Sequence, residues 1–326
     1  GFYYDRIFVV SAYNHVTNWL LEHKKTGEPG VYDLFVKKKD YRKALEILLD
    51  KLLEINQTLE GIGLDLDEAE RFIRDRVDQC RNYLVSLEEV IASGYVNKEN
   101  ILLAAREILA SIGEAHSAFN SVNILKNNGI ESIFVDLCGF HDAEYLSIDE
   151  RIRQAFKEID FSAVVPIATG YTKGTEGIMR EFDRGYSEVT FSKIAVAVKA
   201  GEAVIHKEYH LSSADPAIVG VEQSKPVGAT NFNVADQLAD IGMEAIHPKA
   251  SKPLEVAGIN IRIKNTFEPE HPGTLISEDY VGEVSRVEII SGTDKVTAME
   301  GDDPFRVGRV GSDLDERGGG QRAGRS

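Results

Sequence analysis

The sequence has little cysteine, no long hydrophobic run and fewer basic than acidic residues. Cys80 and Cys138 are the two cysteines among 326 residues, and their wide separation argues against a disulfide framework or a cysteine-rich metal site. No apolar run approaches the roughly 18 residues needed to cross a bilayer. The first residues lack a basic segment followed by an apolar one, so we expect no signal peptide and a cytoplasmic location.

The deficit of positive charge limits the classes of partner. Lysine and arginine number 37 against 53 aspartates and glutamates, which gives a formal net charge of −16. Nucleic-acid binding normally needs a basic face, so we expect no nucleic-acid partner. A phosphate-bearing substrate stays compatible, because one cationic pocket can operate inside an acidic shell.

Hydrophobic spacing predicts several helices and short strands. Apolar residues three and four apart mark helices over residues 40–58 and 67–92, and a third helix is expected over 99–112, ending at Gly113. Short apolar runs then alternate with helices, which predicts a mostly parallel sheet covered on both faces, with ligands at the carboxyl ends of its strands. The expected strands span residues 133–137, 164–167, 203–205 and 259–263, and the expected helices span 147–160 and 188–200.

The pattern changes near residue 280. Two β-type runs flank Ser291–Asp294, which predicts a hairpin over residues 284–299, and a Gly/Arg-rich tail beyond Gly311 is expected to be disordered. We therefore expect a main domain over residues 1–280, a small region over 281–310 and a tail over 311–326.

Polar and charged side chains follow the predicted strands. Ser11–Asn18 could bind a carboxylate or phosphate oxygen beside a helix N-terminus, or simply cap that helix. Glu114 could pair with a substrate ammonium or be a solvated charge. Arg184 offers a planar fork for a carboxylate or phosphate, whereas Ser187 and Glu188 also suit the start of a helix.

Two later segments carry histidines. His206 and His210 are four residues apart, but Pro216 and the preceding strand indicate a loop, so a zinc site is not expected. Ile246–Lys249 ends a helical stretch, where the Lys249 ammonium could meet a nucleotide phosphate.

The order of these segments resembles that of the aspartate kinases, members of the amino-acid kinase superfamily. Gly242–Lys249 matches the family's G-x-x-x-(I/L)-H-P-(R/K) helix end, and Ile259–Pro269 with Pro272–Thr274 matches its (V/I)-K-N-T-F-x-P-x-x-P-G-T segment. The resemblance implies an α/β fold, an αβα sandwich like that of carbamate kinase, followed by a truncated regulatory (ACT) region. More narrowly, the chain is similar to aspartate kinases of ectoine biosynthesis in the segments Leu20–Gly30, Tyr145–Glu150, Gly185–Glu188 and His206–His210.

The resemblance also implies a reaction. Such enzymes transfer the γ-phosphoryl group of ATP, with Mg²⁺ as cofactor, to the β-carboxylate of L-aspartate, giving 4-phospho-L-aspartate and ADP. This is the first step of aspartate-family amino-acid biosynthesis. The matching positions are Thr17, Glu114 and Arg184 for aspartate, Arg184 and Glu188 for catalysis, and Ser213, Asp215 and Lys249 for the nucleotide. No protein metal ligand and no membrane partner is implied, and homo-oligomerisation is left open.

The chain departs from the family in ways that keep other interpretations open. The family opens with a strand carrying Lys-x-Gly-Gly-Thr/Ser, whose lysine contacts the phosphates, and nothing before Ile7 matches it. His206 and Lys207 stand where Thr and Asp are usual, and Ser212 replaces a Tyr. A second interpretation is a catalytically impaired fragment or a non-catalytic relative that binds ligand without turnover. A third is a kinase for another acidic or carbamoyl substrate.

Overall fold

The computed structural model describes residues 4–220, 222–240, 246–282 and 289–290. The predicted hairpin over residues 284–299, almost all of the region 281–310 and the Gly/Arg tail lie outside the described residues. Among the described residues, none of the helices is long and apolar enough to span a membrane.

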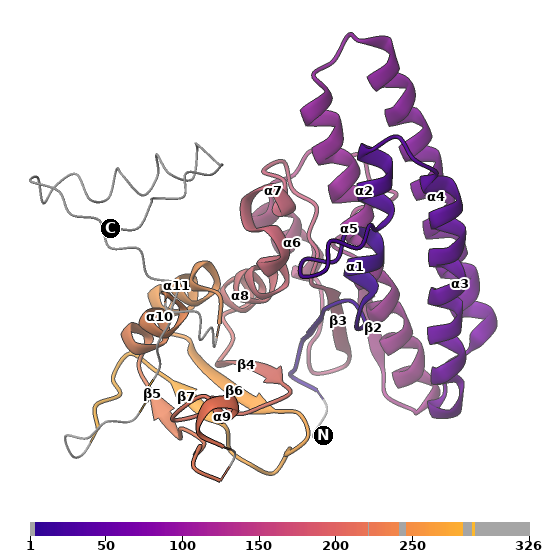
Figure 1. Cartoon of the computed structure of the whole chain (residues 1–326). Helices are drawn as coiled ribbons and strands as arrows, with labels where there is room; N and C mark the ends of the chain where they lie inside the picture. Colours follow the sequence, from indigo (N-terminus) through magenta and orange to yellow (C-terminus); the bar gives the residue numbers. More distant parts are fainter. Residues whose placement is uncertain (1–3, 221, 241–245, 283–288, 291–326) are drawn as a thin grey trace, which may run out of the picture.

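A layer of helices forms the first half of the chain (Figure 1). The aspartate side chains of Asp40 and Asp65 accept hydrogen bonds from backbone N–H groups at the starts of α3 and α4, and Asn97 does the same for α5. The apolar stripes of α3 and α4 pack into one core with α5, as the spacing predicts. The elements of this layer are α1 (Val16–Leu20), α2 (Val31–Val36), α3 (Tyr41–Leu59), the 3₁₀ turn η1 (Glu60–Ile62), α4 (Leu66–Ser93) and α5 (Lys98–Asn127).

The predicted end of the third helix at Gly113 is wrong, because α5 continues to Asn127. Glycine usually signals a helix end, but here it permits close packing. A Cβ added at Gly113 would lie 2.8 Å from the Ala12 Cβ and 3.0 Å from a Val16 methyl group, well inside ordinary contact. Glu114 therefore lies in the middle of a buried helix rather than in a solvated loop.

The first sheet has the order β1-β3-β2, and all its strands are parallel. Ser147 and Glu150 form a reciprocal capping box at the start of α6, as expected for this position. The elements of this part are β1 (Phe8–Val10), β2 (Ser132–Val135), α6 (Ile148–Phe156), β3 (Val165–Thr169), α7 (Ile178–Phe182), the 3₁₀ turn η2 (Asp183–Gly185) and α8 (Tyr186–Val198).

The second sheet has the order β4-β6-β7-β5, with β7 antiparallel to β6. The prediction that Ile246–Lys249 ends a helix is wrong: His247 caps α11 and Pro248 occupies its first turn, where the missing proline N–H costs no hydrogen bond. The elements are β4 (Glu202–Lys207), α9 (Pro216–Val219), β5 (Ala229–Thr230), α10 (Phe232–Asp240), α11 (Pro248–Val256), β6 (Asn260–Asn265) and β7 (Thr274–Ile276).

Helix α8 joins the two sheets. Tyr186 and Ile194 on this helix belong to the core of the first part, whereas Val189 and Ala195 belong to the core of the second. Within the described residues, β1 pairs with β3 alone and β4 with β6 alone. Their remaining edges line a groove of about 1680 Å³ that α8 also lines. The mainly parallel α/β arrangement agrees with the prediction, but the sheet is divided at this groove.

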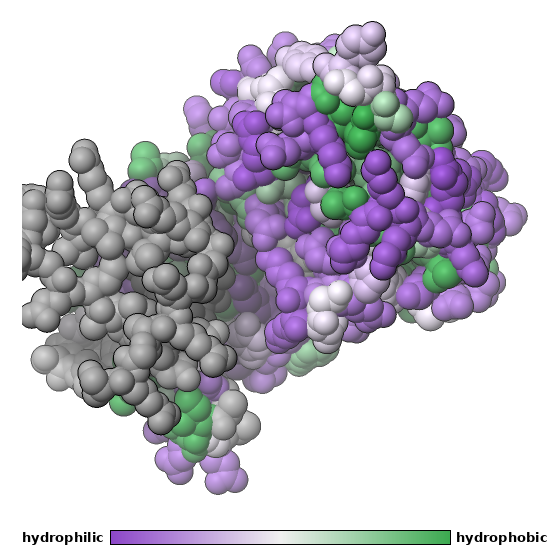
Figure 2. All heavy atoms as spheres, turned by 45° about the horizontal axis from the view of Figure 1, so that its top comes forward, coloured by the Kyte–Doolittle hydropathy of each residue, from purple (hydrophilic) through white to green (hydrophobic). Residues whose placement is uncertain are grey.

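The surface reflects the excess of charge. The helical part of the face in Figure 2 is mainly hydrophilic, with small and separate hydrophobic patches. The candidate functional site lies at the place where the strands and α5 meet the start of α8, the helix that joins the two sheets.

Candidate functional site

The side chain of Glu114 lies where α5 meets the start of α8. Glu114 is 1 % exposed, and the Ser187 hydroxyl donates a hydrogen bond of 2.6 Å to its Oε1. Within the described residues its buried Oε2 has no hydrogen-bond partner of regular geometry. A buried carboxyl oxygen without a regular hydrogen bond can accept one from a ligand N–H.

Burial controls the charge of Glu114. It raises the pKa of this carboxyl group to about 8, against the opposing effect of nearby donors from Ser187, Tyr171 and Tyr186. Burial therefore favours the neutral, protonated form of Glu114 in the unliganded protein. A cationic ligand group beside it would favour the ionised form and release that proton.

Two glycines bring the loop after β3 and the start of α8 close to Glu114. A Cβ at Gly170 would lie 2.9 Å from the Ser187 Cβ and 3.0 Å from the Val10 carbonyl oxygen. Gly113 lets α1, with the half-buried Thr17, approach α5. The structure thus brings together the elements that carry Thr17, Glu114 and Ser187, and the roles of Thr17 and Glu114 stay predictions.

Glu188 follows Ser187 on α8 and connects the second sheet to the start of this helix, next to Glu114. Its Oε1 lies 3.3 Å from the Lys207 ammonium at the end of β4, and its Oε2 accepts a 2.6 Å hydrogen bond from the His247 N–H. The position of Lys207, noted in the sequence as a departure, places a cation at the carboxyl end of a parallel strand. A substrate anion is expected at this end.

Arg184 and Lys249 lie near the same turn. The backbone of Arg184 belongs to η2, and its side chain lies outside the described part of the structure. The Lys249 ammonium donates to the Glu181 carbonyl at 3.1 Å and lies 5.1 Å from the centre of the Phe182 ring. Lys249, at the start of α11, thus comes close to the helix that precedes Arg184.

Ser213 and Asp215 lie in a different place, in the loop after β4. The Ser213 hydroxyl accepts a hydrogen bond from the Lys225 N–H at 3.1 Å, and the Asp215 carbonyl accepts from the N–H groups of Ile218 and Val219 at 3.0 Å. These contacts shape the loop itself, so the predicted nucleotide role of both residues stays a prediction.

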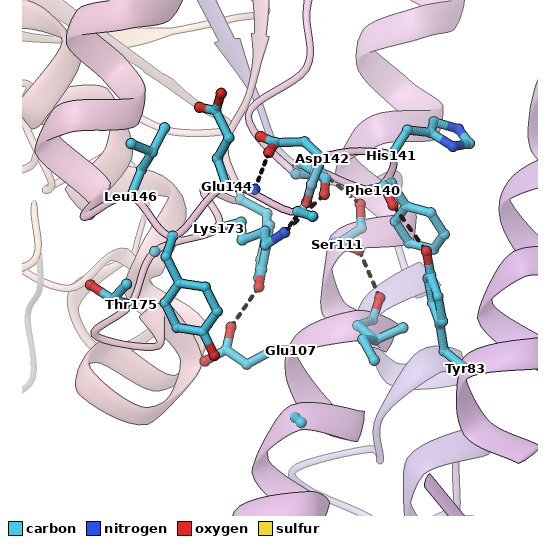
Figure 3. Close-up of a pocket in the computed structure, with 18 of the residues that line it drawn as sticks. Tyr83, Glu107, Ser111, Phe140, His141, Asp142, Glu144, Leu146, Lys173 and Thr175 are labelled. Carbon is cyan, nitrogen blue, oxygen red and sulfur yellow. Dashed lines mark hydrogen bonds between the residues drawn. The ribbon is translucent and has the colours of Figure 1, made fainter. Parts of the chain in front are cut away.

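The sequence analysis missed two neighbours on α5, Arg106 and Glu107. Glu107 lines a cavity of about 810 Å³ between α5 and the loops that follow β2 and β3. Figure 3 shows this cavity with Glu107 and Ser111 from α5 and Lys173 and Thr175 from the loop after β3. No periodic pattern singles out Arg106 or Glu107, because their partners lie more than 60 residues away in sequence.

Comparison with known proteins gives consistent matches. The model of the amino acid kinase family matches residues 5–265. The chain is 49% identical over 315 residues to the aspartate kinase Ask_Ect of Stutzerimonas stutzeri, covering 96% of this chain and 66% of that protein. It is 30% identical to the aspartokinase of Schizosaccharomyces pombe, over 63% of this chain and 41% of the relative.

Solved structures agree on the fold. The aspartate kinase of Clostridium acetobutylicum superposes with a TM-score of 0.56 at 22% identity, over 86% of this chain and 58% of that one. E. coli aspartokinase III in complex with aspartate and ADP also gives a TM-score of 0.56, at 18% identity and over 85% of this chain and 58% of that one. The chain spans just under two thirds of the length of its 49%-identical relative and less than half of the S. pombe protein.

Proposed function

Because the chain belongs to the amino acid kinase family, we propose that it phosphorylates L-aspartate. The β-carboxylate oxygen would attack the γ-phosphorus of ATP, the bond from that phosphorus to the β,γ-bridging oxygen would break, and 4-phospho-L-aspartate and ADP would leave. Consumption of the product in ectoine biosynthesis, which the sequence resemblance implies, is part of this proposal. The carrying observation is the buried Glu114 with its open oxygen beside Ser187.

Three residues account for recognition of aspartate. The ammonium group would meet the open oxygen of Glu114, and Arg184 would hold the α-carboxylate with its guanidinium fork. Thr17, on the helix that packs against Gly113, would bind a substrate carboxylate. Opposite charges at both ends of a short substrate fix its orientation, which leaves the β-carboxylate free to react.

Glu188 and Lys207 would act next to the reacting groups. The nucleophile is already a carboxylate, so the reaction needs no strong base, and catalysis depends on positioning two anions and screening their charge. Lys207, held by Glu188 at the end of β4, supplies a positive charge on this side. Lys249, with Ser213 and Asp215, would contact the nucleotide.

Mg²⁺ fits this arrangement without a cage of protein ligands. Among the described residues there is no cluster of three or more His, Cys, Asp or Glu side chains suited to hold a metal. Mg²⁺ in phosphoryl-transfer sites is usually bound by substrate phosphates and one or two carboxylates, and Glu188 offers one. When bound with the nucleotide, the ion would neutralise charge that develops on the phosphoryl oxygens.

One observation favours the second interpretation, ligand binding without turnover. The groove between β1 and β4 leaves two strand edges unpaired by described residues, in the region where the resemblance implies a further strand with a phosphate-binding lysine. Homo-oligomerisation and a cytoplasmic location stay predictions.

An acceptor-dependence assay tests the proposal. ADP release is coupled to a spectroscopic readout and measured with L-aspartate, L-glutamate or carbamate as acceptor, on this chain and on a version extended at its amino end by the implied strand. Aspartate-dependent ADP release, accompanied by an acyl phosphate that hydroxylamine traps, supports the function. Release with glutamate or carbamate but not aspartate would assign another acceptor.

A further inference from the structure

Arg106 and Glu107 are adjacent on α5 and contact opposite ends of the short helix α7. This helix leads into residues 183–187, which carry Arg184 and Ser187 and which we call the substrate turn. Glu107 lies two helical turns before Glu114, so the two carboxyl groups share one face of α5. Glu107 faces the start of α7, and Arg106 faces its end. Both positions are defined by hydrogen bonds and ion pairs of described side chains.

Glu107 holds the start of α7. Its Oε1 accepts hydrogen bonds from the N–H groups of Met179 at 2.8 Å and Arg180 at 3.4 Å. Its Oε2 accepts one from the Tyr171 hydroxyl at 2.7 Å. A Cβ at Gly177 would lie 3.1 Å from Glu107 Oε1, closer than ordinary contact. The φ of 77° at Gly177 is one that glycine adopts readily and other residues do not. One carboxylate therefore joins α5, the β3 loop and the first turn of α7.

Arg106 holds the other end of α7. Its guanidinium contacts Asp183 at 3.2 Å and both carboxylate oxygens of Glu22 at 3.2 Å. It also lies over the Tyr32 ring, with 5.1 Å between the guanidinium carbon and the ring centre. Lys24 adds a second contact to Asp183 at 2.6 Å. These neighbours fix the guanidinium before any substrate binds.

Asp183 is the residue that needs this support. Its backbone has a φ of 47°, which is in the left-handed region and is unfavourable for a residue with a Cβ. Such conformations persist where the surrounding structure imposes them, and they concentrate at functional sites. Asp183 immediately precedes Arg184 in η2, and Ser187 lies three residues after Arg184. The direction of the backbone at Asp183 therefore decides where the substrate turn begins.

We propose that Arg106 and Glu107 are positioning residues: by holding the two ends of α7 they fix the turn that carries Arg184, and this inference rests on the proposed aspartate site. They contact neither substrate nor nucleotide. Their loss moves the ligands of aspartate more than the nucleotide side, where Lys249 contacts the Glu181 carbonyl of α7 but is carried by α11.

Binding measurements separate positioning from general stability. Arg106→Gln removes the ion pair with Asp183, and Glu107→Leu removes the hydrogen bonds to the start of α7. Glu107→Gln keeps an acceptor for the Met179 N–H. The matched controls Arg74→Gln and Glu70→Leu break an exposed pair of 3.2 Å on α4. Calorimetry gives the Kd of each full-length variant for L-aspartate and for ADP. We expect the aspartate Kd to rise about tenfold in the first two variants, roughly the effect of one lost charge-assisted hydrogen bond. The ADP Kd rises by less than the aspartate Kd, because Lys249 contacts α7 but is carried by α11. The controls stay unchanged, and Glu107→Gln stays within about threefold of the parent chain.

Amide hydrogen exchange tests the contact between Glu107 and α7 without any ligand. The Met179 N–H, now bonded to Glu107, should exchange at least about tenfold faster in Glu107→Leu than in the parent chain and the controls. Equal weakening of aspartate and ADP, an unchanged aspartate Kd, or unchanged exchange at Met179 would each overturn the positioning role. If the parent chain itself binds no aspartate, the proposed function fails, and that result is distinct from an aspartate-binding parent whose variants bind equally well.

Discussion

Ser187 Oγ and Glu114 Oε1 lie 2.6 Å apart although 73 residues separate them in sequence. The contact joins the middle of α5 to the first turn of α8, at the point where the two sheets meet. It places a buried carboxyl group, whose pKa is raised by burial, beside the turn that carries Arg184. The first two predictions depend on the protonation of Glu114.

The stability of the unliganded protein should depend on the proton of Glu114. Burial raises the folded-state pKa of this group to about 8 from an ordinary value of 4.5. Between these two pH values the folded protein holds a proton that the unfolded chain has lost. The contribution of Glu114 to the free energy of unfolding is therefore greatest below pH 4.5 and falls as pH rises toward 8, by up to about 1.4 kcal/mol per pH unit. Denaturant unfolding from pH 5 to 9 measures it. Glu114→Gln should flatten this part of the profile, and the half-buried control Glu70→Gln on α4 should not.

Aspartate binding should release a proton. The ligand ammonium favours the ionised form of Glu114, so at pH 7 up to about one proton leaves for each aspartate bound. Calorimetry at pH 7 in buffers of different ionisation enthalpy counts these protons. In Glu114→Gln the binding enthalpy should lose the part of its buffer dependence that comes from this proton. The same proton count in both proteins would show that aspartate does not meet Glu114.

Recognition of the α-carboxylate should depend on the guanidinium fork of Arg184. Arg184→Lys keeps the charge but loses bidentate geometry, so we expect the apparent affinity for aspartate to fall about tenfold or more and that for ATP to change little. Steady-state kinetics on the extended chain, with the two substrates varied in turn, measures both. Arg180→Lys, four residues earlier, is the matched control. Unchanged aspartate affinity in Arg184→Lys would remove this residue from the substrate site.

The groove between β1 and β4 predicts weak turnover for the chain as given. An unpaired strand edge lowers stability, and a further phosphate-binding lysine of the kind that the resemblance implies is worth on the order of a hundredfold in rate. Extension by the implied strand should raise both the melting temperature and the specific activity with aspartate. A scrambled extension of equal length and composition is the control. Equal activity with and without the strand would contradict this explanation of the groove.

The local features of the fold could be predicted from the sequence, whereas the contacts of the site could not. The stripes over residues 40–58 and 67–92 follow from spacing, and the structure confirms them. Gly113 misled the prediction because its reason is long-range packing against Ala12. The His247-Pro248 pair was placed at a helix end although a proline suits a first turn equally well.

The site shows the same division. Glu114 and Glu188 were identified from the order of motifs, which carries the resemblance. Their partners Ser187, Lys207 and His247 are set by tertiary structure. The contacts of Arg106 and Glu107 with the two ends of α7 are set in the same way. Local pattern contains no information on which distant side chain completes a hydrogen bond.

The most direct test of the account is aspartate-dependent ADP release by the extended chain. With ATP and Mg²⁺ present, we predict saturable ADP release with L-aspartate, formation of an equal amount of hydroxylamine-trapped acyl phosphate, and loss of both in Glu114→Ala. ADP release that is independent of aspartate, or that persists unchanged in Glu114→Ala, would contradict the account.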